Sequence, residues 1–122
     1  MTFTLADLIR FVVALGLINV WLFRSMLSTP FRGGAAKNLR EEFRVYGLGD
    51  AAFWCIGALK LSCAGLFLAS PWFAEGALPA AVMLCVLMLG AIAMHIKAKD
   101  PVVKSLPALV MLLLNVWLVL AA

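Results

Sequence analysis

The chain has 122 residues, of which 66% are hydrophobic and only 13% are charged. A soluble domain averages about 25% charged residues, so this chain lacks the polar side chains that would cover a surface in water. The net charge is +4, but eight of the ten Lys and Arg residues fall in two connecting loops, where they act as topology signals. The composition therefore predicts one membrane domain over residues 1–122, with the lipid bilayer as its surroundings and no nucleic-acid partner.

Four apolar segments are long enough, or nearly so, to cross a bilayer as helices. A helix needs about 20 mainly apolar residues to span the roughly 30 Å hydrocarbon core. The segments cover about residues 5–23, 46–69, 78–96 and 105–121. Strands are not expected, because an open sheet in lipid would leave backbone groups without hydrogen bonds. The sequence thus predicts an all-α, membrane-embedded four-helix bundle.

The first connecting loop contains a short amphipathic segment. Leu39, Phe43 and Tyr46 recur at i, i+4 and i+7, with charged residues between them. This pattern is typical of a short helix that lies at the membrane interface between the first two spans. Gly33 and Gly34 precede it; the pair is interpreted as a plain turn in preference to an anion-binding nest.

The loop charges also predict how the chain is oriented. The first loop carries five basic residues, the third carries three and the second carries none. In chain order they are Arg24, Arg32, Lys37, Arg40, Arg44, Lys97, Lys99 and Lys104. Because positive loops stay inside, we expect loops 1 and 3 in the cytoplasm and both termini outside.

The second span contains the most informative residue, Lys60. At 100° per residue, Asp50, Gly57, Lys60 and Ala64 share a sector about 80° wide. Lys60 lies near mid-membrane, so it is either a ligand or proton site facing the bundle interior, or it pairs with a buried carboxylate or snorkels to the interface. Trp54, one turn after Asp50, is a candidate for lining a ligand pocket.

Small residues follow the opposite side of the same span. At alternating spacings of four and three they are Ala51, Cys55, Ala58, Ser62, Gly65 and Ala69. Small side chains in this register let two helix backbones approach closely, which predicts an interface with another membrane protein or a second copy. The three cysteines all fall in apolar spans, and they give neither a disulfide framework nor a metal-ligand spacing.

The third and fourth spans add one polar candidate each. His95 ends the third span near the cytoplasmic interface, where a histidine can act as acid, base or ligand; the alternative is an interfacial cap beside the following lysines. Asn115 lies in the outer half of the fourth span, and polar groups in lipid are costly unless they are paired or functional.

Three motifs stand out along the chain: FRGGAAKNLREEF at 31–43, followed by YGL at 46–48; GALK at 57–60; and MHIKAKDP at 94–101. Together they resemble the DoxX-like family of small bacterial membrane proteins. The resemblance covers essentially the whole chain and implies a four-helix bundle in the bacterial inner (plasma) membrane. Lys60, His95 and Asp100 match family positions. Members have been linked to thiosulfate or quinol oxidoreductases and to receptor chaperones, so the resemblance implies no single activity.

Two functions remain open from the sequence. In the first, the bundle binds a hydrophobic small molecule, with a quinone as one candidate, through Lys60, Asp50, His95, Trp54 and Asn115, in a redox-linked role. In the second, the chain is a non-catalytic accessory or assembly subunit, or a chaperone, that docks through the small-residue side of the second span. A channel or transporter is disfavoured, because no inverted repeat or broken helix pair is evident. No catalytic residue is assigned.

Overall fold

The computed structural model describes residues 3–27 and 30–122, and its regular secondary structure is helical throughout that part of the chain. The α-helices are α1 (Leu5–Ile18), α2 (Leu39–Val45), α3 (Asp50–Ala69), α4 (Ala77–Lys97) and α5 (Leu106–Ala121). A π-helix, η1 (Asn19–Phe23), continues α1, and the 3₁₀ helices η2 (Ala74–Gly76) and η3 (Val102–Ser105) lead into α4 and α5. Four helical segments, Leu5–Phe23, Asp50–Ala69, Ala74–Lys97 and Val102–Ala121, are long and apolar enough to cross a membrane, which confirms the predicted architecture.

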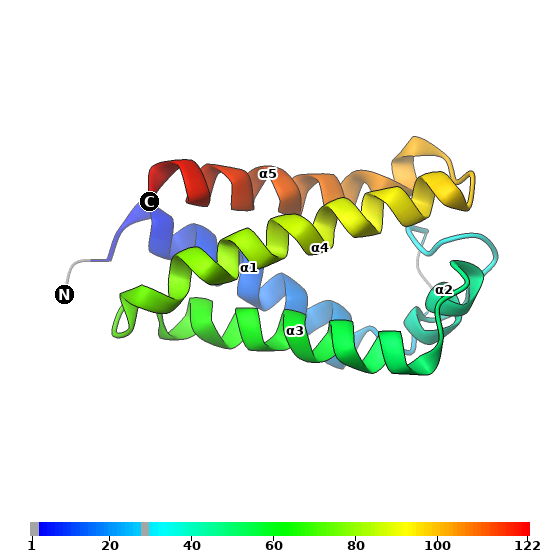
Figure 1. Cartoon of the computed structure of the whole chain (residues 1–122), viewed down its shortest axis with the longest axis horizontal. Helices are drawn as coiled ribbons and strands as arrows, with labels where there is room; N and C mark the ends of the chain where they lie inside the picture. Colours follow the sequence, from blue (N-terminus) through cyan, green and yellow to red (C-terminus); the bar gives the residue numbers. More distant parts are fainter. Residues whose placement is uncertain (1–2, 28–29) are drawn as a thin grey trace.

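The four long helices form a closed bundle in which neighbours run in opposite directions. α1 packs against α3 and α5, and α4 packs against the same two helices. The start of α1, the end of α5 and η2 lie at one end of the bundle, whereas α2 and the connection from α4 to α5 lie at the other (Figure 1). Both basic loops therefore meet at one end, which we term the loop end.

The core combines small and large side chains so that the helices can approach closely. Val13 and Ala14 of α1, Ala64 and Phe67 of α3 and Leu84 of α4 are at most 1% exposed. Many other large apolar side chains face outward, as Val86 and Leu120 do with 60% and 79% exposure. Such a surface would be unfavourable in water, and it fits a bundle that lipid surrounds.

The interfacial helix exists, but its apolar side faces the bundle. Asn38 caps α2 by accepting a hydrogen bond from the Glu41 amide at 2.9 Å. Leu39 and Phe43 are buried against Trp21 and Phe53, on η1 and α3. Because these side chains bury their area against protein, α2 closes the loop end of the bundle.

The second span begins later than its hydrophobic pattern predicts. Tyr46 caps the end of α2, and α3 begins only at Asp50. Gly47 separates the two helices with a φ of 80°. Glycine adopts this conformation with little strain, whereas other residues are strained by it. The helix thus begins four residues after the predicted start at about residue 46, because Tyr46, although apolar enough, is the C-cap of α2.

The π-helix η1 turns Trp21 toward the bundle. The Arg24 amide donates to the Asn19 carbonyl five residues back, at 2.8 Å, so this turn holds one residue more than an α-helical turn. Trp21 is consequently only 8% exposed. A Cβ atom on Gly57 of α3 would lie 2.6 Å from the Trp21 ring, so glycine is required for this close approach.

We expect Gly57→Ala to lower the free energy of unfolding by about 1–3 kcal/mol, because the added methyl group overpacks the contact with Trp21. Gly65→Ala on the same helix is the matched control. A Cβ there meets nothing within 4 Å, and the higher helix propensity of alanine should leave stability unchanged or improved. Unfolding in mixed detergent micelles would measure both, and equal effects would contradict the packing argument.

Candidate functional site

A cavity of about 250 Å³ lies inside the loop end of the bundle. We term it the Lys60 cavity. Its walls come from the four long helices α1, α3, α4 and α5, from η1, η3 and α2, and from the loop that precedes α2. Its polar lining residues are Asn19, Arg24, Arg32, Glu42, Lys60, His95 and Lys104, and the rest of the lining is apolar. A mainly apolar hollow with a few convergent polar groups is typical of a small-molecule site.

We infer the position of the opening from the exposed lining residues. These are Asn19 and Val20 of η1, Arg24, Pro30 and Phe31 of the first loop, and Pro107 of α5. They place the opening between η1 and α5, beside the first loop. Leu17, Met88 and His95 are buried and form the deeper wall. A ligand could therefore enter sideways, from the bilayer, with its polar end toward the loops.

Lys60 reaches the cavity from α3. Its ammonium lies over the Trp21 ring, 5.6 Å from the centroid, which is within the range of a cation–π contact. Among the described residues, no carboxylate oxygen comes within 4.0 Å of this ammonium. Glu42, a buried carboxylate that lines the same cavity and interacts with Lys60 electrostatically, is thus not in direct ion-pair contact with it.

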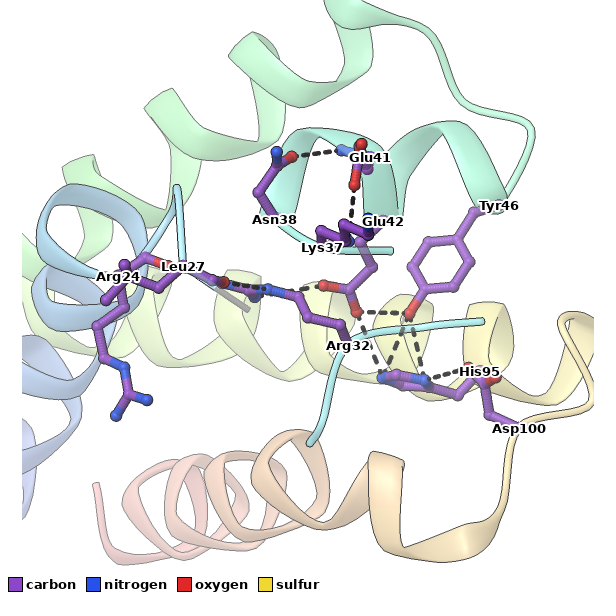
Figure 2. A network of polar contacts seen from close by, with 10 residues as sticks. All are labelled: Arg24, Leu27, Arg32, Lys37, Asn38, Glu41, Glu42, Tyr46, His95 and Asp100. Atoms are coloured by element: carbon purple, nitrogen blue, oxygen red, sulfur yellow. Dashed lines mark hydrogen bonds and ion pairs between the residues drawn. The ribbon is translucent and has the colours of Figure 1, made fainter. Parts of the chain in front are cut away.

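A buried ion pair joins the first loop to α2 (Figure 2). Arg32 Nη1 donates to Glu42 Oε2 at 3.3 Å, and the two side chains are 8% and 9% exposed. Arg32 also donates to the carbonyls of Leu27 and Arg24, at 3.3 and 2.8 Å. Such hydrogen bonds are needed to offset the cost of taking two charges out of water.

The same glutamate begins a chain of polar contacts that crosses to α4. The Tyr46 hydroxyl donates to Glu42 Oε1 at 2.7 Å, and it lies 3.2 Å from His95 Nδ1. His95 Nδ1 in turn lies 2.8 Å from Asp100 Oδ2. Together with Arg32, these residues form what we term the buried polar cluster, which Figure 2 shows in full.

The end of α4 brings Asp100 back to His95. The Asp100 amide donates to the His95 carbonyl and the Lys99 amide to the Ile96 carbonyl, both at 3.0 Å. Lys99 has a φ of 57°, as the residue after a helix C-cap does in a Schellman motif. The reversal places an aspartate carboxylate against a histidine of the same helix.

The glycine pair in the first loop binds a carboxylate of the chain itself. The Gly34 amide donates to Asp100 Oδ1 at 2.9 Å, and Gly34 adopts a φ of 53°. Lys104 donates to the Gly34 carbonyl at 2.8 Å, which ties the two basic loops together. A Cβ on Gly33 would lie 2.5 Å from the Tyr46 ring, so both glycines have structural roles. The pair is thus more than the plain turn expected from the sequence.

The surroundings shift the pKa values of two side chains at the loop end, Tyr46 and Asp100. Burial, and then the hydrogen bond to Glu42, raise the pKa of the Tyr46 hydroxyl, so it stays protonated and can donate. Burial by itself would raise the pKa of Asp100, but contacts with His95, the Gly34 amide and Lys104 outweigh it. The net result is a lowered pKa, which keeps Asp100 ionised beside His95.

The structure brings together only some of the predicted ligand-binding residues. Lys60 and His95 both line the Lys60 cavity. Asp50 instead pairs with Arg40 at 2.6 Å on the surface, and Trp54 is 63% exposed on the outside of α3. Asn115 is fully buried on α5 but lines neither the cavity nor the cluster; its amide donates to the Met111 carbonyl.

The predicted interface residues lie on the outer side of α3. Ala51, Cys55, Ala58, Ser62 and Gly65 are all exposed. The packed side of the helix is the one that carries Gly57 and Ala64. Within the described part of the chain, the small-residue side is therefore left exposed, and its role as an interface stays a prediction.

Sequence reasoning missed several residues of the site. Glu42, Arg32 and Trp21 line the cavity, and Tyr46 contacts His95. Asp100 was identified only as a family position, without the contact to His95 that the structure shows. For Glu42 and Arg32 a signal was present, since each is a charge within the resemblance motif, but loop charges are usually solvated. The pairing depends on the fold of the loop, which residue spacing does not specify.

One of three comparisons with known proteins finds a match. The model of the DoxX-like family matches residues 12–119, which is nearly the whole chain. No curated protein and no solved structure matches. The matched range includes all the residues that line the Lys60 cavity.

We expect Arg32→Met to lower the free energy of unfolding by about 3–5 kcal/mol, because it leaves Glu42 buried without its cation. Arg32→Met combined with Glu42→Gln should recover part of this loss, since the uncompensated charge is gone. Arg44→Met serves as the control: its ion pair with Asp50 is exposed, and such pairs contribute little. A loss no larger in Arg32→Met than in Arg44→Met would contradict the buried cluster.

Asp100→Asn is expected to destabilise the protein near neutral pH and to leave its stability unchanged at acidic pH. A group whose pKa is lowered by folding stabilises the protein above its ordinary pKa, about 3.9 for Asp. That contribution disappears as the pH falls through the lowered value. Melting temperatures measured across pH would show the two proteins converging below about pH 4. Glu75→Gln, an exposed change at the opposite end, should show no such convergence.

Proposed function

Because the chain belongs to the DoxX-like family and holds a polar-lined cavity within its transmembrane bundle, we propose that it binds a hydrophobic small molecule there. The observation that carries the proposal is the convergence of Lys60 and His95, from α3 and α4, on one cavity of about 250 Å³. The two side chains come from distant parts of the sequence, and polar groups inside a bundle are usually functional or paired.

A quinone is one ligand whose chemistry fits this cavity. The Lys60 ammonium can donate to a carbonyl oxygen, and the Trp21 ring offers an apolar wall in the place first assigned to Trp54. His95 lines the same cavity, while its ring nitrogens face the buried polar cluster: Nδ1 lies 2.8 Å from Asp100 and Nε2 lies 3.3 Å from the Tyr46 hydroxyl. The opening between η1 and α5 would leave an apolar tail in the bilayer. In a redox-linked role, the contacts of His95 with Tyr46 and Asp100 would hold its ring in place while a proton moves.

The proposal includes an orientation in the bilayer. Loops 1 and 3 would lie on the cytoplasmic side of a bacterial inner membrane, with both termini outside, because the basic residues gather at the loop end. The cavity would then receive its ligand from the cytoplasmic leaflet, with the polar cluster nearest to the cytoplasm.

The second candidate function is that of an accessory or assembly subunit or chaperone. It is favoured by the small-residue side of α3, which is exposed and contacts no other helix of the chain closely at Gly65. In that case Ala58 and Gly65 would touch another membrane protein or a second copy.

Native mass spectrometry of the protein released from its own membranes in mild detergent tests the first function. We expect a bound small molecule that is lost in the double variant Lys60→Ala and His95→Ala and retained in Lys37→Ala, an exposed change outside the cavity. A ligand that persists in the double variant would overturn the assigned site.

The same spectra address the accessory role. A ligand-free protein that arrives as a stable oligomer or hetero-complex, and that dissociates in Ala58→Leu with Gly65→Leu but not in Lys60→Ala, would favour the second function over the first.

A further inference from the structure

The lining of the Lys60 cavity carries an excess of positive charge. Its cations are Arg24, Arg32, Lys60 and Lys104, whereas Glu42 is its one carboxylate. Glu42 is already engaged, because Arg32 and the Tyr46 hydroxyl contact its two oxygens. Lys104 is also engaged, with the Gly34 carbonyl at 2.8 Å and Asp100 at 3.9 Å.

Two of these cations have no carboxylate to pair with. In the described part of the chain, no Asp or Glu oxygen lies within 4.0 Å of the Lys60 ammonium or the Arg24 guanidinium. The backbone of Arg24 accepts a hydrogen bond from Arg32, while its guanidinium points away from the buried polar cluster (Figure 2). The Trp21 ring alone does not replace the hydration that an ammonium loses inside a membrane bundle.

The positions of the two cations match a ligand that lies across the opening. Lys60 projects from α3 into the interior, and the exposed Arg24 follows η1 at the edge of the opening. The same lining includes the apolar residues Leu17, Met88 and Met111. At about 250 Å³ the hollow is smaller than a pocket that encloses a drug-sized molecule, roughly 300–1,000 Å³. It would hold a head group and the start of a tail.

We infer that the ligand of the Lys60 cavity is an amphiphile with a compact oxyanion head group, a carboxylate or a phosphate. Lys60 pairs with the head group inside the cavity and Arg24 pairs with it at the opening, while the tail leaves between η1 and α5. This inference rests on the proposed function, and it narrows the ligand class from any hydrophobic molecule to an acidic one.

Equilibrium dialysis tests the inference on the full chain in nanodiscs of zwitterionic lipid. The probes are decyl phosphate, decanoate, decanol, a quinone with a decyl tail and inorganic phosphate. We expect both anionic amphiphiles to bind roughly tenfold or more tightly than decanol, as a charged hydrogen bond would provide. Lys60→Met should remove that preference, Lys60→Arg should keep it and Arg24→Met should reduce it. Arg44→Met, which alters an exposed residue outside the cavity, should change nothing.

Each other outcome counts against a defined part of the inference. Equal binding of decanol or of the quinone, unaffected by Lys60→Met, would overturn the oxyanion head group and leave the proposed function standing. Binding of inorganic phosphate as tight as that of decyl phosphate would overturn the amphiphile. If no probe binds a protein whose thermal unfolding is normal, both this inference and the proposed function fail.

Competition experiments identify whether the head group belongs to a lipid or to a free acid. Displacement of decyl phosphate by phosphatidylglycerol added to the nanodisc would support a lipid phosphate, and displacement by decanoate alone would support a free fatty acid. Displacement by neither would overturn a single shared site for the two anions.

Discussion

The ion pair between Arg32 and Glu42 is the contact on which the loop end of this bundle depends. Both charges are buried, so the pair is favourable only because further hydrogen bonds complete it: two backbone carbonyls for the arginine and the Tyr46 hydroxyl for the glutamate. These contacts fix the first loop and α2 across the end of the bundle. With α2 in place, Tyr46 meets His95, and a cavity is enclosed beneath.

The second constraint is the turn of η1. One extra residue in the turn brings Trp21 inward, and the missing side chain at Gly57 lets α3 come close enough to pack on its ring. Trp21 then serves two regions, since it packs with Phe43 beneath α2 and forms the wall beside Lys60. A π-helical turn within a span frequently marks a functional region, and here it borders the opening of the cavity.

Charge is distributed unevenly around the cavity, and this distribution is what indicates the chemical class of its ligand. Towards the loops, each carboxylate is matched by hydrogen-bond donors, as Asp100 is by His95 and Gly34. Towards the bilayer, no carboxylate oxygen of the described residues lies within 4.0 Å of the Lys60 ammonium. Family membership establishes the architecture over nearly the whole chain. The ligand has to be argued from this asymmetry, because the family match names no ligand.

The sequence by itself determined the four spans, the short helix α2 and the inward-facing sector of α3 that carries Lys60. These follow from local hydrophobic periodicity, because lipid selects for apolar length and each helix satisfies its own backbone. Only the tertiary structure decided which polar groups meet. Gly34 and Asp100 lie 66 positions apart, and Trp21 in place of Trp54 lines the cavity because of a π-turn that leaves no mark in the hydropathy pattern. Such contacts depend on how loops fold over the bundle, and residue spacing along one helix carries no information about that.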